Sequence, residues 1–245
     1  GLEYIAPYLR GGTDEISLAE NNQLPKVVTL KDIKGDCHMH SLYSDGKNSL
    51  QEMVTAAEKK GYEYIAFTDH SPSLHIANGL TEGRLEQKYK EIQSIQKNSK
   101  IKILHGAEVD ILANGELDYS DSTLKKLDFV IASIHQGFNN NPEERYIKAM
   151  QNPHVDCIGH LTTRHIGKRA ELDIDYERIF IEAAKQNIII EINASKRRMD
   201  IPHHLISLAV KHKNKFILNT DAHSTKQLDN MQIGVLLAQS ARLHK

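Results

Sequence analysis

The chain has 245 residues, of which 40% are hydrophobic and 26% are charged, and its formal net charge is -1. This composition is that of an ordinary soluble globular protein, long enough for one large domain or two small ones. The chain as a whole has no electrostatic bias toward nucleic acid or anionic membranes. This weakens the case for a nucleic-acid substrate without excluding one.

Residues 1–32 differ from the rest of the chain because they are polar and rich in turn residues, as in Gly11-Gly12-Thr13 and Asn21-Asn22. Residues 15–20 can form one short helix. We expect this segment to be an arm or linker with little core of its own. An ordinary N-terminal extension fits it as well as a functional segment does.

From Ile33 onward, short apolar runs alternate with amphipathic segments. The expected strands are Ile33–His38, Tyr64–Thr68, Ile101–Val109, Phe129–Ser133, Val155–Gly159, Ile188–Ile192 and Phe216–Thr220. The expected helices are Leu50–Lys60, Thr81–Asn98, Ser122–Lys126, Glu143–Met150, Asp175–Lys185, Pro202–His212 and Lys226–Gln239. Ser49 and Glu52 form a capping-box pattern before the first of these helices, and Gly61 marks its end.

This alternation of strands and helices predicts a parallel α/β sheet, and near-continuous apolar runs such as residues 188–190 are typical of strands covered on both faces. Seven such units over residues 33–245 favour a TIM-like (β/α)7 barrel, with a doubly wound open sheet as the alternative. The barrel is preferred because polar residues at the ends of most strands can meet only if those ends surround a common axis.

Most of the expected strands have a His, Asp or Glu within two residues of their C-terminal end. His38-x-His40 places both imidazoles on one face of an extended segment, and Asp221-x-His223 does the same. The nine candidate ligands are His38, His40, Asp45, His70, Glu108, His135, His160, Asp221 and His223. Imidazole mixed with carboxylate suits zinc, manganese or iron, and nine ligands are too many for one tetrahedral zinc. The sequence therefore predicts two or three divalent metal ions, with Glu108 as the bridging carboxylate.

Several neighbours of these ligands are expected to face away from the metals. Asp36 and Asp69 each precede or flank a ligand histidine, and we expect them to orient ligands from behind. Cys37 is expected on the opposite strand face from the histidines. Cys37 and Cys157 are the only cysteines, and two unlinked thiols suit a reducing compartment. With no signal peptide and no membrane-spanning run in the sequence, we expect a cytoplasmic protein.

The segments that carry the ligands resemble the motif set of the polymerase and histidinol phosphatase (PHP) family. The matching segments are His38-x-His40, Ser44-Asp45-Gly46, Thr68-Asp69-His70, Gly106-x-Glu108, Ser133-x-His135, Gly159-His160 and Asp221-x-His223. The resemblance covers residues 33–245 and implies a PHP phosphoesterase domain, folded as a distorted (β/α)7 barrel with a trinuclear site at the C-terminal ends of the strands. It groups the ligands as His38, His40, Glu108 and Asp221 for one metal, Glu108, His135 and His160 for a second, and Asp45, His70 and His223 for a third.

The arm adds a narrower resemblance. Residues 3–10, Leu24-Pro25 and residues 32–36 resemble the linker into the PHP domain of bacterial family X DNA polymerases, and residues 159–164, 191–194 and 221–224 are similar too. This resemblance implies a 3′-5′ exonuclease or 3′-phosphatase acting on DNA, as in DNA repair, with a polymerase core as partner in cis or in trans. The chain is then either a fragment of such a polymerase or a free-standing relative.

We therefore expect a metal-dependent phosphoesterase, in which bound metals lower the pKa of the attacking water. Glu108 is expected to be catalytic through the metals that it bridges, and Arg164 and Arg197 are the preferred phosphate-binding residues. The full set of basic candidates is Arg164, Lys168, Arg169, Lys196, Arg197 and Arg198. The alternatives are a small-molecule phosphatase, such as one acting on histidinol phosphate, and a non-catalytic scaffold for a polymerase. The presence of all nine ligands argues against the scaffold.

Overall fold

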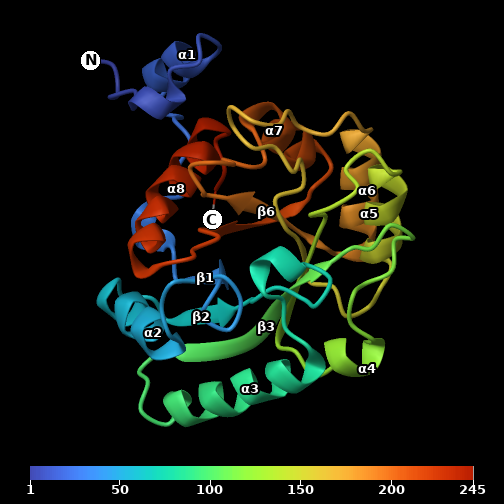
Figure 1. The fold of residues 1–245 in the computed structure, drawn as a ribbon. Coiled ribbons are helices and arrows are strands. Elements are labelled where there is room, and N and C mark those ends of the chain that lie inside the picture. Colours follow the sequence, from blue (N-terminus) through green and yellow to red (C-terminus); the bar gives the residue numbers. More distant parts are fainter. Residues whose placement is uncertain (245) are drawn as a thin grey trace.

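The computed structural model describes residues 1–244 and shows seven parallel strands that curl into a nearly closed barrel (Figure 1). The strands are neighbours in chain order: β1 (Gly35–Met39), β2 (Tyr64–Phe67), β3 (Lys102–Asp110), β4 (Phe129–Ser133), β5 (Cys157–Ile158), β6 (Ile189–Asn193) and β7 (Lys215–Asn219). Beyond β7, the Ala222 carbonyl accepts a 2.8 Å hydrogen bond from the His40 N–H, which draws the first and last strands together. The predicted α/β barrel is confirmed, and the doubly wound alternative is wrong because that fold orders its strands differently.

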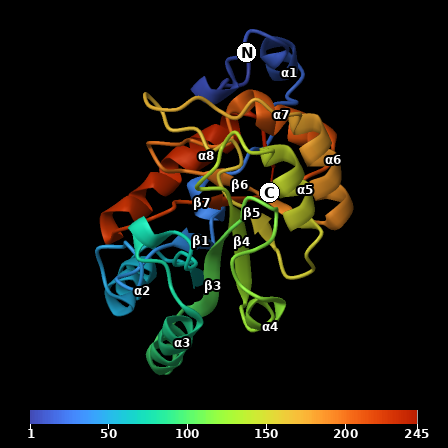
Figure 2. The same cartoon turned by 45° about the vertical axis from the view of Figure 1, so that its right-hand side comes forward.

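Helices connect the strands and cover the outside of the barrel. They are α2 (Leu50–Lys59), α3 (Glu82–Gln96), α4 (Asp121–Leu124), α5 (Pro142–Met150), α6 (Tyr176–Gln186), α7 (His203–Lys211) and α8 (Met231–Ser240). The helices α5 to α8 pack as successive neighbours around one side (Figure 2). The capping box predicted for α2 is confirmed, since the Glu52 carboxylate accepts from the Ser49 N–H at 2.8 Å. None of the helices within residues 1–244 is long and apolar enough to cross a bilayer.

Short 3₁₀ helices fill several of the connections. They are η1 (Pro7–Leu9), η2 (Leu30–Asp32), η3 (His75–Ala77) and η4 (Thr225–Asn230). The segment expected to be one helix over residues 226–239 therefore divides into η4 and α8. The helix expected over residues 15–20 is confirmed as α1 (Glu15–Glu20).

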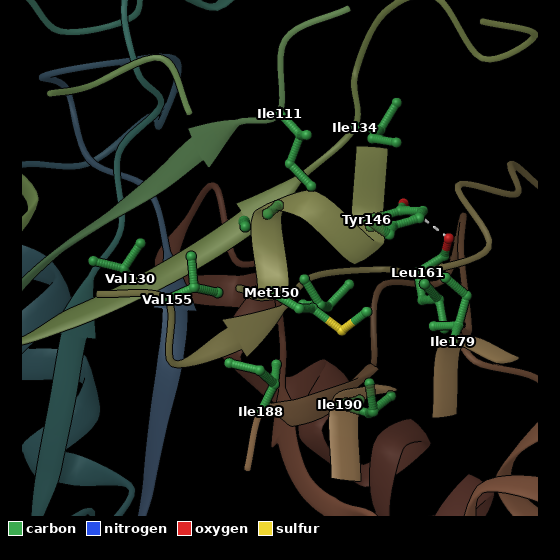
Figure 3. Close-up of a cluster of buried hydrophobic side chains, with 14 of the residues drawn as sticks. Ile111, Val130, Ile134, Tyr146, Met150, Val155, Leu161, Ile179, Ile188 and Ile190 are labelled. Carbon is green, nitrogen blue, oxygen red and sulfur yellow. Dashed lines mark hydrogen bonds between the residues drawn. The ribbon is translucent and has the colours of Figure 1, made fainter. Parts of the chain in front are cut away.

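A large apolar core lies between the strands and the helices α5 and α6 (Figure 3). Tyr146 and Met150 of α5 pack there against Val130 of β4 and Ile190 of β6. Tyr146 is fully buried, and its hydroxyl donates to the Leu161 carbonyl at 2.9 Å. The core thus holds the segment that follows β5 in a fixed position at the rim of the barrel.

Residues 1–32 add no strand to the barrel. The helices η1 and α1 lie beside α8 at the periphery of the molecule (Figure 1). Arg242, which follows α8, pairs with Asp14 at 2.6 Å. Leu2, Tyr4 and Ile16 are more than half exposed.

The strand β1 departs from regular alternation, because its register against β2 shifts between Asp36 and Met39. Cys37 packs with Ala66 and Cys157 in the apolar cluster that the strands enclose. The next residue, His38, hydrogen-bonds Glu191, which also faces the interior. The expectation that Cys37 faces away from the histidines is therefore wrong, and the irregular register is the reason. Both cysteines are free thiols.

Candidate metal centre

The nine candidate ligands converge at the C-terminal end of the barrel. Every strand except β6 supplies at least one of them, either from its last residues or from the loop that follows. Seven of them line one cavity of about 340 Å³: Asp45, His70, Glu108, His135, His160, Asp221 and His223. His38 and His40 are fully buried and lie against Glu108 and Asp221.

The ligand atoms form three overlapping groups in which all atoms lie within 4.8 Å of one another. The groups are His40, Asp45, His70 and His223; His38, His40 and Asp221; and His70, Glu108 and His135. His160 is in none of them, but its Nε2 lies 2.8 Å from Glu108 Oε1. His40 and His70 are each shared by two groups, so the clusters are less separate than the grouping implied by the sequence resemblance.

Glu108 lies at the middle of the cluster and is fully buried. Its Oε2 is 3.2 Å from His38 Nε2 and 3.0 Å from His70 Nδ1, and its Oε1 is 3.2 Å from His135 Nε2. None of these five atoms has a hydrogen-bond partner within residues 1–244. Buried polar atoms nearly always have partners, so lone pairs that converge in this way fit a bound cation. Histidine and carboxylate donors are also the set that zinc, manganese or iron prefers.

The charges of the cluster also favour a cation. Burial raises the pKa of the Glu108 carboxyl group, but the nearby histidines outweigh it and hold that pKa well below its usual value. His38 and His40 hold the pKa of the Asp221 carboxyl group low in the same way. Burial lowers the pKa of His135, but Glu108 and Asp110 overcome this and raise it to about 10. The low pKa values keep both carboxyl groups ionised, and a metal ion would displace the proton that the raised pKa of His135 favours.

Two buried carboxylates that the sequence did not single out orient the histidine rings. Glu191 on β6 accepts from His38 Nδ1 at 2.6 Å, and Asp110 at the end of β3 accepts from His135 Nδ1 at 2.5 Å. The Nε2 atoms of both rings are thereby directed at Glu108. A carboxylate behind a metal-binding histidine fixes the tautomer and the ring orientation. An acidic residue inside each apolar strand was the only sequence signal for this role.

Asp36 and Asp69 were expected to orient the rings of the ligand histidines. In the structure they hold chain segments in place instead. Asp36 accepts from the His38 N–H at 3.2 Å and from the Thr220 hydroxyl, so it joins the backbones of β1 and the segment after β7. The ring of His38 is held by Glu191 instead.

Asp69 belongs to a buried ion pair. Lys88 of α3 is fully buried, and its Nζ lies 3.2 Å from Asp69 Oδ2. Asp69 also accepts from the Ser41 N–H at 2.8 Å and from the Ser44 hydroxyl at 2.7 Å. Both serines lie in the loop 40–45, which carries two candidate ligands. The Lys88–Asp69 ion pair therefore fixes this loop against β2 and β3.

The backbone at two ligand positions is unusual. His160 has a φ of +25° and Asp221 has a φ of +54°, in the region that non-glycine residues rarely adopt. Gly46 follows Asp45, and a side chain there would place a Cβ 2.5 Å from the His40 carbonyl oxygen. Positive φ values at non-glycine residues such as His160 and Asp221 cost about 1–3 kcal/mol each and cluster at functional sites.

The two preferred arginines lie in different environments. Arg197 lines a second cavity of about 610 Å³ beside the metal cluster. Arg164 lines neither cavity, and its Nε donates to the Arg198 carbonyl at 2.7 Å while its Nη2 donates to the Met199 carbonyl. Its guanidinium therefore fixes the loop after β6, which is a different role from the phosphate contact expected for it.

Two other basic candidates reach the metal cavity. Arg198 lines both cavities, and its Nε lies 3.4 Å from Asp221 Oδ2. Arg169 lines the metal cavity, with its guanidinium 3.9 Å from the centre of the Phe138 ring. Lys196 lines the second cavity, and Lys168 lines neither.

Comparisons with known proteins agree with this geometry. Residues 36–195 match the PHP domain family. The chain is 43% identical over 244 residues to the DNA polymerase/3′-5′ exonuclease PolX of Bacillus subtilis, a match that covers 98% of the chain but only 42% of that protein. It is 30% identical over 206 residues to a probable phosphatase of Clostridium botulinum, covering 79% of the chain and 80% of the relative. The crystal structure of a histidinol phosphate phosphatase from Lactococcus lactis, in complex with zinc, L-histidinol and phosphate, has the same fold, with a TM-score of 0.61 at 20% identity. That match covers 86% of this chain and 94% of the other.

Proposed function

Because the chain belongs to the PHP domain family and is a metal-dependent hydrolase of phosphate esters, we propose that it removes nucleotides or phosphate from the 3′ end of DNA. The observation that carries the proposal is the convergence of nine ligand side chains at one end of the barrel, seven of which line one cavity, combined with the likeness to a 3′-5′ exonuclease over nearly the whole chain. We assign the activity to residues 33–245 and treat residues 1–32 as an arm. A polymerase core, in cis or in trans, is the proposed partner, and two free, buried thiols support a cytoplasmic location.

The nine side chains would hold two or three divalent ions, with zinc, manganese and iron as the candidates. Such ions lower the pKa of a bound water toward neutrality and neutralise phosphate oxygens. The two oxygens of Glu108 lie against different histidines, Oε2 against His38 and Oε1 against His135, which suits a bridging role. Glu191 and Asp110 keep the Nε2 atoms of His38 and His135 directed at the same place.

Arg198 and Arg169 are the proposed contacts for the phosphate group. Both line the metal cavity, and a guanidinium group can donate two parallel hydrogen bonds to phosphate oxygens. Arg169 is held in place by its own contacts, because its Nε donates to the Thr163 carbonyl at 2.9 Å and its guanidinium stacks on Phe138. The Arg198 side chain is 21% exposed and is free to leave Asp221 for a phosphate.

The second candidate is a phosphatase of small molecules such as histidinol phosphate. The observation that favours it is the 30% identity to a probable phosphatase over 79% of the chain. A cavity of about 340 Å³ is also large enough for a small ligand.

Product analysis separates the two candidates. Manganese- or zinc-loaded protein is given a 3′-labelled oligonucleotide and, separately, histidinol phosphate. We expect labelled mononucleotide or phosphate to be released from the oligonucleotide, and we expect release to stop when a chelator removes the metal. Fast hydrolysis of histidinol phosphate without any action on the oligonucleotide would overturn the proposal and favour the second candidate.

A further inference from the structure

A positively charged groove adjoins the metal cavity. The second cavity, of about 610 Å³, shares Asp45, Arg198, Asp221 and His223 with the metal cavity, so the two are continuous. Its remaining charged lining is basic. We call it the cationic groove and define it by Lys47, Lys196, Arg197 and Lys226.

The four cations of the cationic groove come from three separate loops. Lys47 follows β1, Lys196 and Arg197 follow β6, and Lys226 lies in η4 after β7. Within residues 1–244 none of their side chains makes a hydrogen bond or an ion pair, although other surface cations, such as Lys34 with Glu63, do so. Neighbouring cations repel one another, so these four unpaired cations form a site that favours an added anion.

Part of the lining of the metal cavity is apolar. It is formed by Leu74, Ile76 and Ala77 after β2 and by Ile134 and Phe138 after β4. Ile76 is 95% exposed, which is unusual for a large apolar side chain at the mouth of a polar cavity. The loops after β2 and β4 thus give the metal cavity an apolar part, and the segments after β1, β6 and β7 line the cationic groove that adjoins the cavity.

From this asymmetry, and resting on the proposed function, we infer that the cationic groove binds the phosphodiester backbone of a DNA strand upstream of the scissile phosphate. The apolar part of the metal cavity then receives the terminal nucleoside. In the reaction the oxygen of water forms a bond to phosphorus, and the bond from phosphorus to the 3′ oxygen of the strand breaks. A proton goes to that oxygen, so the strand remains in the groove with a 3′-hydroxyl and a nucleoside monophosphate leaves from the apolar part.

The inference predicts different effects on a strand and on a simple monoester. The double variant Lys47→Ala/Lys226→Ala removes two cations from the groove without touching a candidate ligand. The matched control is Lys125→Ala/Lys126→Ala, which removes the same charge from exposed positions between α4 and the N-terminal end of β4. The probes are a fluorescent single-stranded oligonucleotide and p-nitrophenyl phosphate, each used with manganese-loaded protein over a range of salt concentrations.

For the groove variant we expect kcat/KM on the oligonucleotide to fall at least about tenfold further than kcat/KM on p-nitrophenyl phosphate, as loss of 1.4 kcal/mol or more of strand binding implies. The slope of log affinity against log salt should become shallower by about 1.4, since each phosphate contact on a single strand contributes about 0.7. The variant Ile76→Ser should raise KM for the oligonucleotide and leave the salt slope as it is.

Three outcomes are decisive. If the groove variant alone shows the shallower slope and the selective loss, the inference is supported. If the wild type cleaves the oligonucleotide but the groove and control variants behave alike, the inference is overturned and the proposed function stands. If the wild type cleaves only the monoester, the proposed function fails, and an oligonucleotide affinity that is equal in the groove and control variants overturns the inference as well.

Discussion

Substitution of Glu191 by glutamine tests the support behind the metal centre. Glu191 Oε1 accepts from His38 Nδ1 at 2.6 Å and from Asn219 Nδ2 at 3.0 Å. Its Oε2 accepts from the His160 N–H at 2.8 Å and from Asn193 Nδ2 at 3.0 Å. All four neighbours are donors, whereas a glutamine amide has one accepting and one donating end. Whichever way it is turned, Glu191→Gln therefore leaves two buried donors facing an NH₂ group.

The size of the effect follows from these contacts. A buried donor without a partner costs about 1–3 kcal/mol, so the free energy of unfolding should fall by roughly 2–6 kcal/mol. Loss of a partner that orients a metal-binding histidine typically weakens metal affinity about 10- to 100-fold. We expect both effects together, because the same carboxylate holds the His38 ring and the His160 backbone.

Chelator competition measures the metal affinity of Glu191→Gln, and urea denaturation followed by circular dichroism measures its stability. Glu177→Gln is the matched control, since Glu177 is exposed on α6 and, within residues 1–244, pairs only with His212 at the surface. If Glu191→Gln binds metal as tightly as the control does and unfolds at the same urea concentration, the role given to Glu191 is refuted.

Three further substitutions test other parts of the site. Glu108→Gln should lower turnover by several orders of magnitude and reduce metal content while the barrel still folds, and near-normal activity with full metal content would contradict the bridging role. Lys88→Met leaves Asp69 buried without its partner and should cost about 3–5 kcal/mol in urea denaturation, whereas Lys90→Met at an exposed site should cost far less. Burial raises the pKa of Asp200 to about 6, above its unfolded value of about 3.9, so its contribution to stability is full below pH 4 and lost as pH rises through 6. The free energy of unfolding of Asp200→Asn should therefore exceed that of the wild type by up to about 3 kcal/mol at pH 8 and by almost nothing at pH 4. A difference that does not change with pH would contradict this.

The barrel could be predicted because local sequence determines its parts. Most strands contain a short apolar run, and the helices α2, α3 and α6 begin at Ser49, Thr81 and Asp175, whose side chains cap them. The strand β5 is the shortest, with only Cys157 and Ile158 in the sheet. There the Asp156 carboxylate accepts from the Val130 N–H at 2.8 Å and takes the place of a backbone partner. A side chain that substitutes for the backbone in this way cannot be read from an apolar pattern.

The candidate ligands could be located because they lie at or near the ends of apolar strands. The buried residues that hold the ligands in place could not be located in this way. Lys88 lies between polar neighbours on α3 and looks like a solvated residue, and only the packing of α3 on β2 and β3 buries it. The choice between Arg164 and Arg198 depends on how the loops after β5 and β6 fold against each other. Sequence spacing carries no information about that contact.

Metal stoichiometry tests the central claim most directly. The folded chain, purified without chelator and then reloaded with zinc or manganese, should contain more than one transition-metal ion per chain by elemental analysis, because the ligand atoms form three overlapping groups. A folded chain that binds one ion or none after reloading would contradict a polynuclear centre.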